Sequence, residues 1–140
     1  MVVTPEKATA FLKDRVQPVP VKTQQEIQKL IADLDSDKYA VRTLASKQLL
    51  ALHEAAVPPL KKALKSQLTS VEQQQRITAL LSALQQPPST DRLRVFRALE
   101  ILEYIADAEA KHILKTVAAG MPGAEETAQA SSTLKRFGKQ

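Results

Sequence analysis

The sequence has no cysteine and no tryptophan, only three glycines, and 4% aromatic residues. The absence of cysteine excludes disulfides, thiol nucleophiles and thiolate metal sites. So few glycines disfavour a strand-rich fold with many tight turns. No apolar run approaches the ~18 residues of a membrane span, so we expect no membrane partner. The N-terminus also lacks a basic segment followed by an apolar stretch, so we expect no signal peptide; the compartment stays open, with the cytoplasm favoured.

The dominant feature of the sequence is helical periodicity interrupted by prolines. Of its 140 residues, 44% are hydrophobic, and the eight prolines are concentrated between the periodic segments. A chain of this length suits one domain, which buries roughly 68 to 70% of the surface that its unfolded chain exposes. The pattern therefore predicts a single domain of helices joined by short corners.

Residues 35–68 hold two apolar stripes separated by a proline corner. Asp35 and Ser36 are expected to cap the first helix, and Pro58 and Pro59 fit the first turn of the second. Steps of three and four residues place the stripe residues of each helix on one face. The expected inward residues are Val41, Leu44, Ala45, Gln48 and Leu52 in the first helix, and Leu60, Ala63 and Leu64 in the second.

Other helix starts are marked by short polar side chains that can accept hydrogen bonds from free amide groups. The expected caps are Thr4, Thr23 with Glu26 as a capping box, Ser70, Ser89 or Thr90, and Asp107. The first helix is expected to turn Ala8, Phe11 and Leu12 inward. Further inward residues are Ile27, Leu30, Ile31, Leu34, Ile77, Leu80, Leu81, Leu84, Ile113, Leu114 and Val117. The first turns of the helix after Ser70, from Gln73 to Arg76, are expected to be exposed.

In the C-terminal half, the spacing of apolar residues predicts a long helix over 91–106 with apolar residues on more than one face. Such a helix is expected to be buried on two sides. Gly120 is placed to end the following helix in a left-handed conformation. The last helix, over 124–137, is expected to bury Ala128, Leu134 and Phe137.

Helix starts recur at about 34 to 37 residues, which is a solenoid period. Tetratricopeptide repeats have a similar length, but their Trp, Gly and Tyr positions are missing. The pattern of Asp37, Val41, Arg42, Ala45 and Leu49, followed by Pro58 or Pro59, Leu60 and Leu64, resembles a HEAT repeat. We therefore predict an all-α, right-handed α-α superhelix of about seven helices, HEAT-like or armadillo-type. Within one domain spanning 1–140, residues 1–22 form an N-terminal helix and proline-rich linker, and 23–137 form stacked helical pairs.

A longer resemblance covers roughly Thr4 to Phe137. It rests on LIADLDSDKYAVRTLASKQLLAL, EAAVPPLKKAL and RALEILEYIADAEAKHILKTVAAGMPGAEETAQASSTLKRF. These segments look like the helical region found in the large WD-repeat proteins of planctomycete bacteria, and 97–103 and 120–124 are the most specific parts. His53 departs from the pattern, since a glycine is expected there. The resemblance implies an accessory helical domain beside a propeller in a larger multidomain protein, and it brings no catalytic residues.

Few residues suggest chemistry. His53 and His112 lie far apart, and Glu100 and Glu103, although spaced for an acid and base pair, are better interpreted as a solvated face with Arg97 as partner to both. Residues 120–123 lack the Lys-Ser/Thr of a phosphate loop. We therefore expect no catalytic, cofactor-binding or metal-binding residue, no small-molecule substrate, and no enzyme activity.

The distribution of charge suggests a possible interaction surface. The formal net charge is +5, and residues 36–70 carry more basic than acidic side chains. The possible interaction patch consists of Lys38, Arg42, Lys47, Lys61, Lys62 and Lys65. Such a patch could attract phosphates or an acidic protein surface, although ordinary solubilising lysines are the favoured interpretation.

The predicted function is that of a non-catalytic helical scaffold for protein-protein interaction. Its partner is a protein or a neighbouring domain of the same chain, and the scaffold is accessory to a WD-repeat propeller. The alternative is a nucleic-acid-binding helical repeat that uses the basic patch in 36–70. Against the alternative, aromatic residues are scarce, and Phe11, Phe96, Phe137 and Tyr104 all fall on apolar stripes, which leaves no base-stacking platform.

Overall fold

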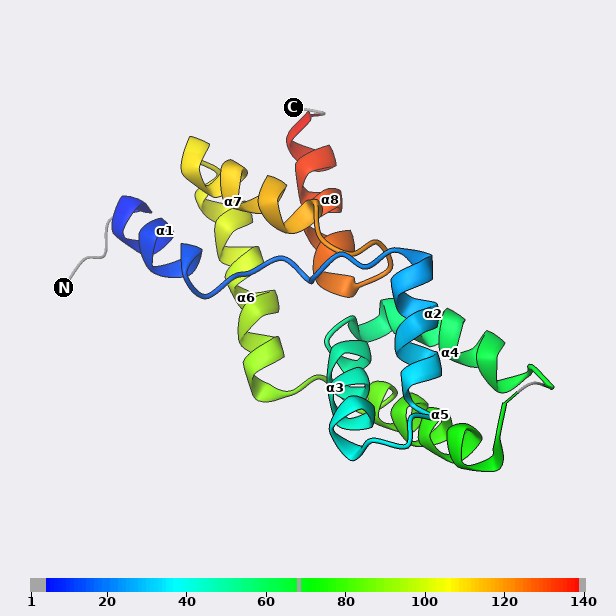
Figure 1. Ribbon diagram of the computed structural model, residues 1–140. Coiled ribbons are helices and arrows are strands. Elements are labelled where there is room, and N and C mark those ends of the chain that lie inside the picture. Colours follow the sequence, from blue (N-terminus) through cyan, green and yellow to red (C-terminus); the bar gives the residue numbers. More distant parts are fainter. Residues whose placement is uncertain (1–4, 68, 139–140) are drawn as a thin grey trace. The chain divides into compact units, whose positions relative to one another are not determined.

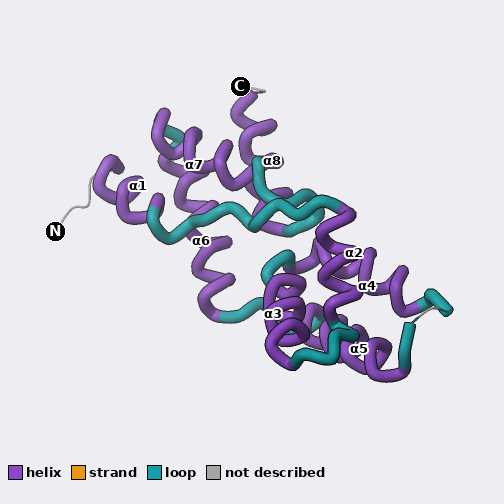
Figure 2. The backbone as a smooth tube through the Cα atoms, in the orientation of Figure 1, coloured by secondary structure: helices purple, strands orange, loops and turns teal. Residues whose placement is uncertain are grey.

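The computed structural model describes residues 5–67 and 69–138 (Figure 1). Within these ranges the chain forms eight α-helices and one 3-10 helix, and no strand (Figure 2). The helices are α1 (Pro5–Lys13), α2 (Gln24–Asp33), α3 (Tyr39–Leu50), the 3-10 helix η1 (His53–Ala56), α4 (Val57–Leu64), α5 (Val71–Leu84), α6 (Thr90–Ile105), α7 (Ala108–Ala118) and α8 (Glu125–Gly138). The all-α class is confirmed, with eight α-helices where about seven were expected. No helix in the described part has the length and apolarity to cross a membrane.

The chain divides into two compact units. One unit comprises residues 20–87 and contains α2 to α5; we call it the α2–α5 unit. The other comprises residues 1–19 and 88–140 and contains α1 and α6 to α8; we call it the α1/α6–α8 unit. Each unit has its own buried side chains.

Several helix starts in the α2–α5 unit match the expected caps. Thr23 Oγ1 accepts a hydrogen bond from the Glu26 amide at 3.2 Å, and the Glu26 carboxylate accepts one from the Thr23 amide at 2.8 Å, so the capping box is confirmed. Ser70 Oγ accepts a hydrogen bond from the Gln73 amide, as expected. The expected cap of α3 is wrong, because Lys38 is its N-cap and makes no side-chain capping bond.

The residues expected to cap α3 serve other contacts. Ser36 Oγ accepts a hydrogen bond from the Lys38 amide, and the Asp35 carboxylate accepts one from the Ser70 hydroxyl at 2.7 Å. Asp35 thus joins the corner after α2 to the start of α5. The Thr4 cap expected for α1 lies outside the described residues.

In the α2–α5 unit, consecutive helices pack as pairs: α2 contacts α3, and α4 contacts α5. The two pairs also contact one another, through α2 with α4 and α3 with α5. The buried apolar residues of these elements are Ile27, Leu30, Ile31, Leu34, Ala45, Leu49, Leu52, Ala56, Leu60, Ile77, Leu80 and Leu81. These side chains make up the buried apolar part of the unit.

Two expectations about this core are wrong. Leu44 is 54% exposed, because α3 turns the overlapping stripe of Ala45, Leu49 and Leu52 inward instead. Gln73 is buried rather than exposed, and its side-chain amide donates to the Ile31 carbonyl at 2.9 Å. Arg76, which is half-buried, likewise donates to the Leu34 carbonyl at 2.6 Å. These polar side chains bind carbonyls at the C-terminal end of α2, where the i+4 amide partners of a helix interior are missing.

The α1/α6–α8 unit also begins its helices at expected caps. Ser89, rather than Thr90, accepts a hydrogen bond from the Arg92 amide, and Asp107 accepts one from the Ala110 amide at 2.7 Å. Helix α7 packs against α6 and α8, and α1 packs against α6 and α7. The buried apolar cluster of this unit contains Leu12, Val16, Ala98, Leu99, Leu102, Ala110, Ile113, Leu114, Val117 and Ala130.

Several inward assignments in this unit are wrong. Helix α6 buries one face instead of two, and it leaves Leu93 and Ile101 about half exposed and Tyr104 91% exposed. Phe11 is 59% exposed, since α1 turns Leu12 inward. In α8 the inward face contains Glu126, Thr127, Ala130 and Thr133, whereas Ala128 is exposed and Leu134 and Phe137 are partly buried.

Positive φ angles occur at His53, Ala106 and Gly123 among the described residues, and not at Gly120, where the sequence predicted one. The glycine with positive φ in this corner is Gly123, at 97°. His53 has φ 52°, so it adopts the left-handed conformation of the glycine expected at its position. Ala106, the residue after α6, is also left-handed, with φ 54°. Non-glycine residues pay a steric cost in this region of backbone space.

Candidate interaction surfaces

The six basic residues of the predicted patch come from two helices. Lys38, Arg42 and Lys47 belong to the start and body of α3, and Lys61, Lys62 and Lys65 to the end of α4. Five of them are exposed, while Arg42 is half-buried. Arg42 donates to the Ser36 carbonyl at 2.7 Å, and its guanidinium lies 5.8 Å from the ring centre of Tyr39. Local contacts thus hold Arg42 at the start of α3.

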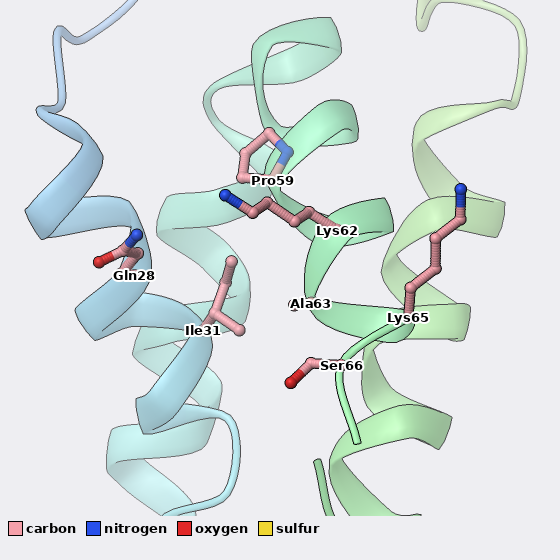
Figure 3. Close-up of a pocket in the computed structure, with 7 residues that line it drawn as sticks. All are labelled: Gln28, Ile31, Pro59, Lys62, Ala63, Lys65 and Ser66. Atoms are coloured by element: carbon pink, nitrogen blue, oxygen red, sulfur yellow. The ribbon is translucent and has the colours of Figure 1, made fainter. Parts of the chain in front are cut away.

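A cavity of about 420 Å³ lies between α2 and α4, and we call it the α2–α4 cavity (Figure 3). Its lining residues are Gln28, Ile31, Pro59, Lys62, Ala63, Lys65 and Ser66. The Lys62 side chain runs from α4 toward α2, whereas Lys65 extends away from α2. The structure therefore brings two patch lysines to one apolar hollow, while Lys38, Arg42 and Lys47 do not line it.

A second hollow, of about 540 Å³, lies between α1 and α6 within the other unit, and we call it the α1–α6 groove. Its lining residues are Phe11, Leu12, Arg15, Asp91, Arg94, Val95, Arg97, Ala98 and Ile101. Leu12 and Ala98 are buried, and Phe11 and Ile101 are exposed. Three arginines and one aspartate surround this apolar surface. The groove thus combines an apolar base with a mainly basic border.

Sequence reasoning missed this groove because it placed Phe11 on a buried stripe, and it made the same error for Tyr104, which lies outside the groove lining. A signal for Tyr104 was nevertheless present: at helical spacing it shares a face with Arg97 and Glu100, both of which are exposed. Charged residues on the same face indicate that the face meets solvent. The same signal was present for Phe11, since the exposed residues Lys7 and Arg15 stand four residues before and after it. The Arg15 guanidinium covers one face of the Phe11 ring, 4.0 Å from the ring centre.

Glu103 pairs with Arg136 of α8 instead of Arg97. Arg136 donates to both Glu103 carboxylate oxygens, at 2.8 and 2.9 Å. These hydrogen bonds hold the pKa of Glu103 below its ordinary value, with a smaller contribution from the positive charge of Arg136, and they raise the pKa of Arg136. The pair joins α6 to α8, so Glu103 serves packing in this structure.

A second ion pair joins the same two helices in a more buried place. Arg92 Nε donates to Glu126 Oε1 at 3.1 Å, and the Glu126 side chain is only 6% exposed. The Arg92 guanidinium also lies 5.2 Å from the ring centre of Phe96. Of the two acidic residues in the first turn of α8, Glu125 is exposed and Glu126 is buried against α6.

The histidines lie on separate elements, His53 in η1 and His112 on the exposed side of α7. Across residues 5–67 and 69–138, no three histidine, aspartate or glutamate side chains gather in a way that could hold a metal ion.

No protein-family model, no curated protein and no solved structure matches this chain.

Proposed function

We propose that this chain is a non-catalytic helical scaffold that binds a partner protein or a neighbouring domain of its own polypeptide. The observation that carries the proposal is the outer face of α6. Leu93, Ile101 and Tyr104 are 44%, 46% and 91% exposed, and helical spacing places them on the same face. Arg97 and Glu100 share this face, so it combines large exposed apolar side chains with charged ones. Protein-binding sites have an apolar core and a polar rim, and tyrosine is enriched in their cores.

The repeat architecture is part of the same proposal. In the α2–α5 unit the first helices of the two pairs contact each other, and so do the second helices. This contact pattern is the one that stacked α-α repeats use, and it supports a HEAT-like, right-handed superhelix. We place this scaffold beside a WD-repeat propeller in a longer protein on the strength of the sequence resemblance.

Photo-crosslinking in the cells that encode the protein tests the scaffold function. A benzophenone amino acid replaces Tyr104, and a matched derivative carries it at Val71, an exposed residue of α5. We expect discrete protein adducts from position 104 that weaken when Ile101 is changed to Ser, and none of the same mass from position 71. Adducts that form equally at both positions, or only with nucleic acid, would contradict the scaffold function.

Nucleic-acid binding is the second candidate, favoured by the α2–α4 cavity. Lys62 and Lys65 line it without any acidic residue, and Lys61 precedes them on α4. If this surface binds phosphates, affinity for short duplex and single-stranded oligonucleotides should fall steeply as salt rises. It should vanish when Lys61, Lys62 and Lys65 are all changed to Glu.

The matched control for this titration changes three exposed lysines of α7 and α8, Lys111, Lys115 and Lys135, to Glu. Its net charge equals that of the patch variant, so it separates a localised site from general attraction. No binding by the unchanged protein at low salt would remove this candidate, and equal loss in both variants would exclude a site at the α2–α4 cavity.

A further inference from the structure

We infer that the α1–α6 groove binds an acidic, amphipathic helical segment of a partner protein. The inference rests on the scaffold function proposed above and adds the chemistry of the partner. The partner must carry apolar side chains that enter the groove and, beside them, carboxylates that bind the arginines of the groove. Shape and charge each contribute an independent argument.

The apolar part of the groove has the size and position to take side chains. Leu12 and Ala98 are buried at its base, Val95 is half-buried, and Ile101 and Phe11 are exposed beside them. A hollow of about 540 Å³ accommodates a few side chains but not a whole helix. A partner helix would therefore lie along the groove and insert the residues of one stripe, as amphipathic helices do in apolar grooves.

The charged part of the groove selects the sign of the partner. Arg15, Arg94 and Arg97 border it. Its single acidic residue is Asp91, whose carboxylate lies 3.5 Å from the Arg94 guanidinium. The side chains of Arg94 and Asp91 are 74% and 93% exposed, so this ion pair is weak and a partner carboxylate can replace Asp91. An arginine guanidinium can donate two parallel hydrogen bonds to the two oxygens of one carboxylate.

The spacing of the arginines also favours a helix as the partner. Arg94 and Arg97 are three residues apart, so they are neighbours on the surface of α6. Carboxylates three or four residues apart on a partner helix have a comparable separation. An acidic helix can therefore engage both arginines while its apolar stripe faces Ile101.

Nucleic acid fits this groove less well. Base stacking needs an accessible aromatic ring, and Arg15 already covers one face of the Phe11 ring at 4.0 Å. The other lining residues of the base are aliphatic, namely Leu12, Val95, Ala98 and Ile101. Aliphatic side chains give a base little to stack on, whereas they suit leucine and similar residues.

The test uses fluorescent synthetic peptides of about five helical turns with leucines at steps of three and four and glutamates beside them. Three further probes are measured beside this acidic peptide. They are a peptide of the same composition in scrambled order, the same peptide with lysine in place of glutamate, and oligothymidylate. We expect the acidic amphipathic peptide alone to bind, with affinity that falls as salt rises.

Two variants of the whole chain locate the site. Arg94→Glu with Arg97→Glu should weaken binding of the acidic peptide by about tenfold or more, and Ile101→Ser should do the same through the apolar contact. Lys29→Glu with Lys111→Glu makes the same change in net charge elsewhere, and Leu44→Ser removes an apolar residue of similar exposure in α3. Both controls should bind as the unchanged chain does, and circular dichroism checks that all four variants remain helical.

The inference is overturned if the acidic peptide does not bind, if the scrambled peptide, the lysine peptide or the oligonucleotide binds as tightly, or if the groove variants and their controls bind alike. The scaffold function has a separate outcome. Tyr104 adducts that persist while no acidic peptide binds would contradict the acidic segment and leave the scaffold standing. Absent adducts alongside groove-dependent peptide binding would contradict the contact proposed for the outer face of α6 and support the groove.

Discussion

Gly120 and Val19 lie backbone against backbone. A Cβ atom on Gly120 would stand 3.0 Å from the Val19 nitrogen and 3.1 Å from the Val19 carbonyl oxygen. The Met121 amide donates to that same carbonyl at 3.0 Å. The segment after α1 is thereby held against the corner between α7 and α8. Glycine is required here for close approach and not for a left-handed turn.

Gly120→Ala should therefore destabilise the protein by roughly 1 to 3 kcal/mol, because the methyl group meets backbone atoms that cannot rotate away. The control is Gly138→Ala, since a Cβ there meets nothing within 4 Å. Urea unfolding followed by circular dichroism measures both. A Gly120→Ala midpoint equal to that of Gly138→Ala would show that the contact with Val19 can relax.

Ala106→Gly should stabilise the protein by roughly 0.5 to 1 kcal/mol. Ala106 ends α6 with φ 54°, a conformation that costs an L-residue about 1 to 2 kcal/mol and glycine almost nothing, although glycine loses more entropy on folding. Ala119, the C-cap of α7, has ordinary helical dihedrals, so Ala119→Gly should destabilise. Thermal unfolding of the two variants should shift in opposite directions, and a shared direction would contradict this account.

Arg92→Ala should cost roughly 3 kcal/mol, since it leaves the buried Glu126 carboxylate without its guanidinium partner. Changing both residues, with Arg92→Met and Glu126→Leu, should recover much of the loss because no charge then remains buried. A double-mutant cycle built from Arg92→Met, Glu126→Leu and the variant with both changes measures the coupling by chemical denaturation. Additive effects of the two single changes would mean that the pair contributes little.

The Glu103 and Arg136 pair should make stability depend on pH in acid. Because the folded pKa of Glu103 lies below its ordinary value, the folded state favours the carboxylate. Its contribution is complete above the ordinary glutamate pKa of about 4.3 and is lost as pH falls through the lower folded value. Glu103→Gln should therefore reduce the difference in melting temperature between neutral and acid pH.

The matched control for the acid prediction is Glu100→Gln, which alters an exposed carboxylate three residues earlier on α6. The effect should be modest, since the Glu103 side chain is 34% exposed and solvent screens the pair. Identical melting curves across this pH range for Glu103→Gln and the unchanged protein would contradict the role of the pair.

Leu60 and Leu64 of α4 allow a comparison of burial within one helix. Leu60 is completely buried, so Leu60→Ala should destabilise by roughly 2 to 5 kcal/mol. Leu64 is half-buried, and Leu64→Ala should cost clearly less, because its side chain already meets solvent in part. The denaturant midpoints of the two variants measure these losses of stability. Equal losses would show that α4 turns a different face inward.

Much of the secondary structure could be predicted because its signals are local. The Thr23 and Glu26 capping box, the Ser70, Ser89 and Asp107 caps, and the proline corners each act within a few residues of chain. Hydrogen bonds between neighbours in sequence do not need the rest of the fold. The sequence by itself thus determined where most helices begin and that the chain is helical.

Which faces are buried, and what they meet, was decided only by the tertiary structure. Helix α3 carries two overlapping stripes, and its neighbours, not its periodicity, turn Leu49 inward and Leu44 outward. Gln73, Gly120 and Glu103 each owe their role to a partner at least 30 residues away, namely Ile31, Val19 and Arg136. Local periodicity carries no information about such partners. The α1–α6 groove depends on the same long-range packing, and for that reason only the folded chain assembles it.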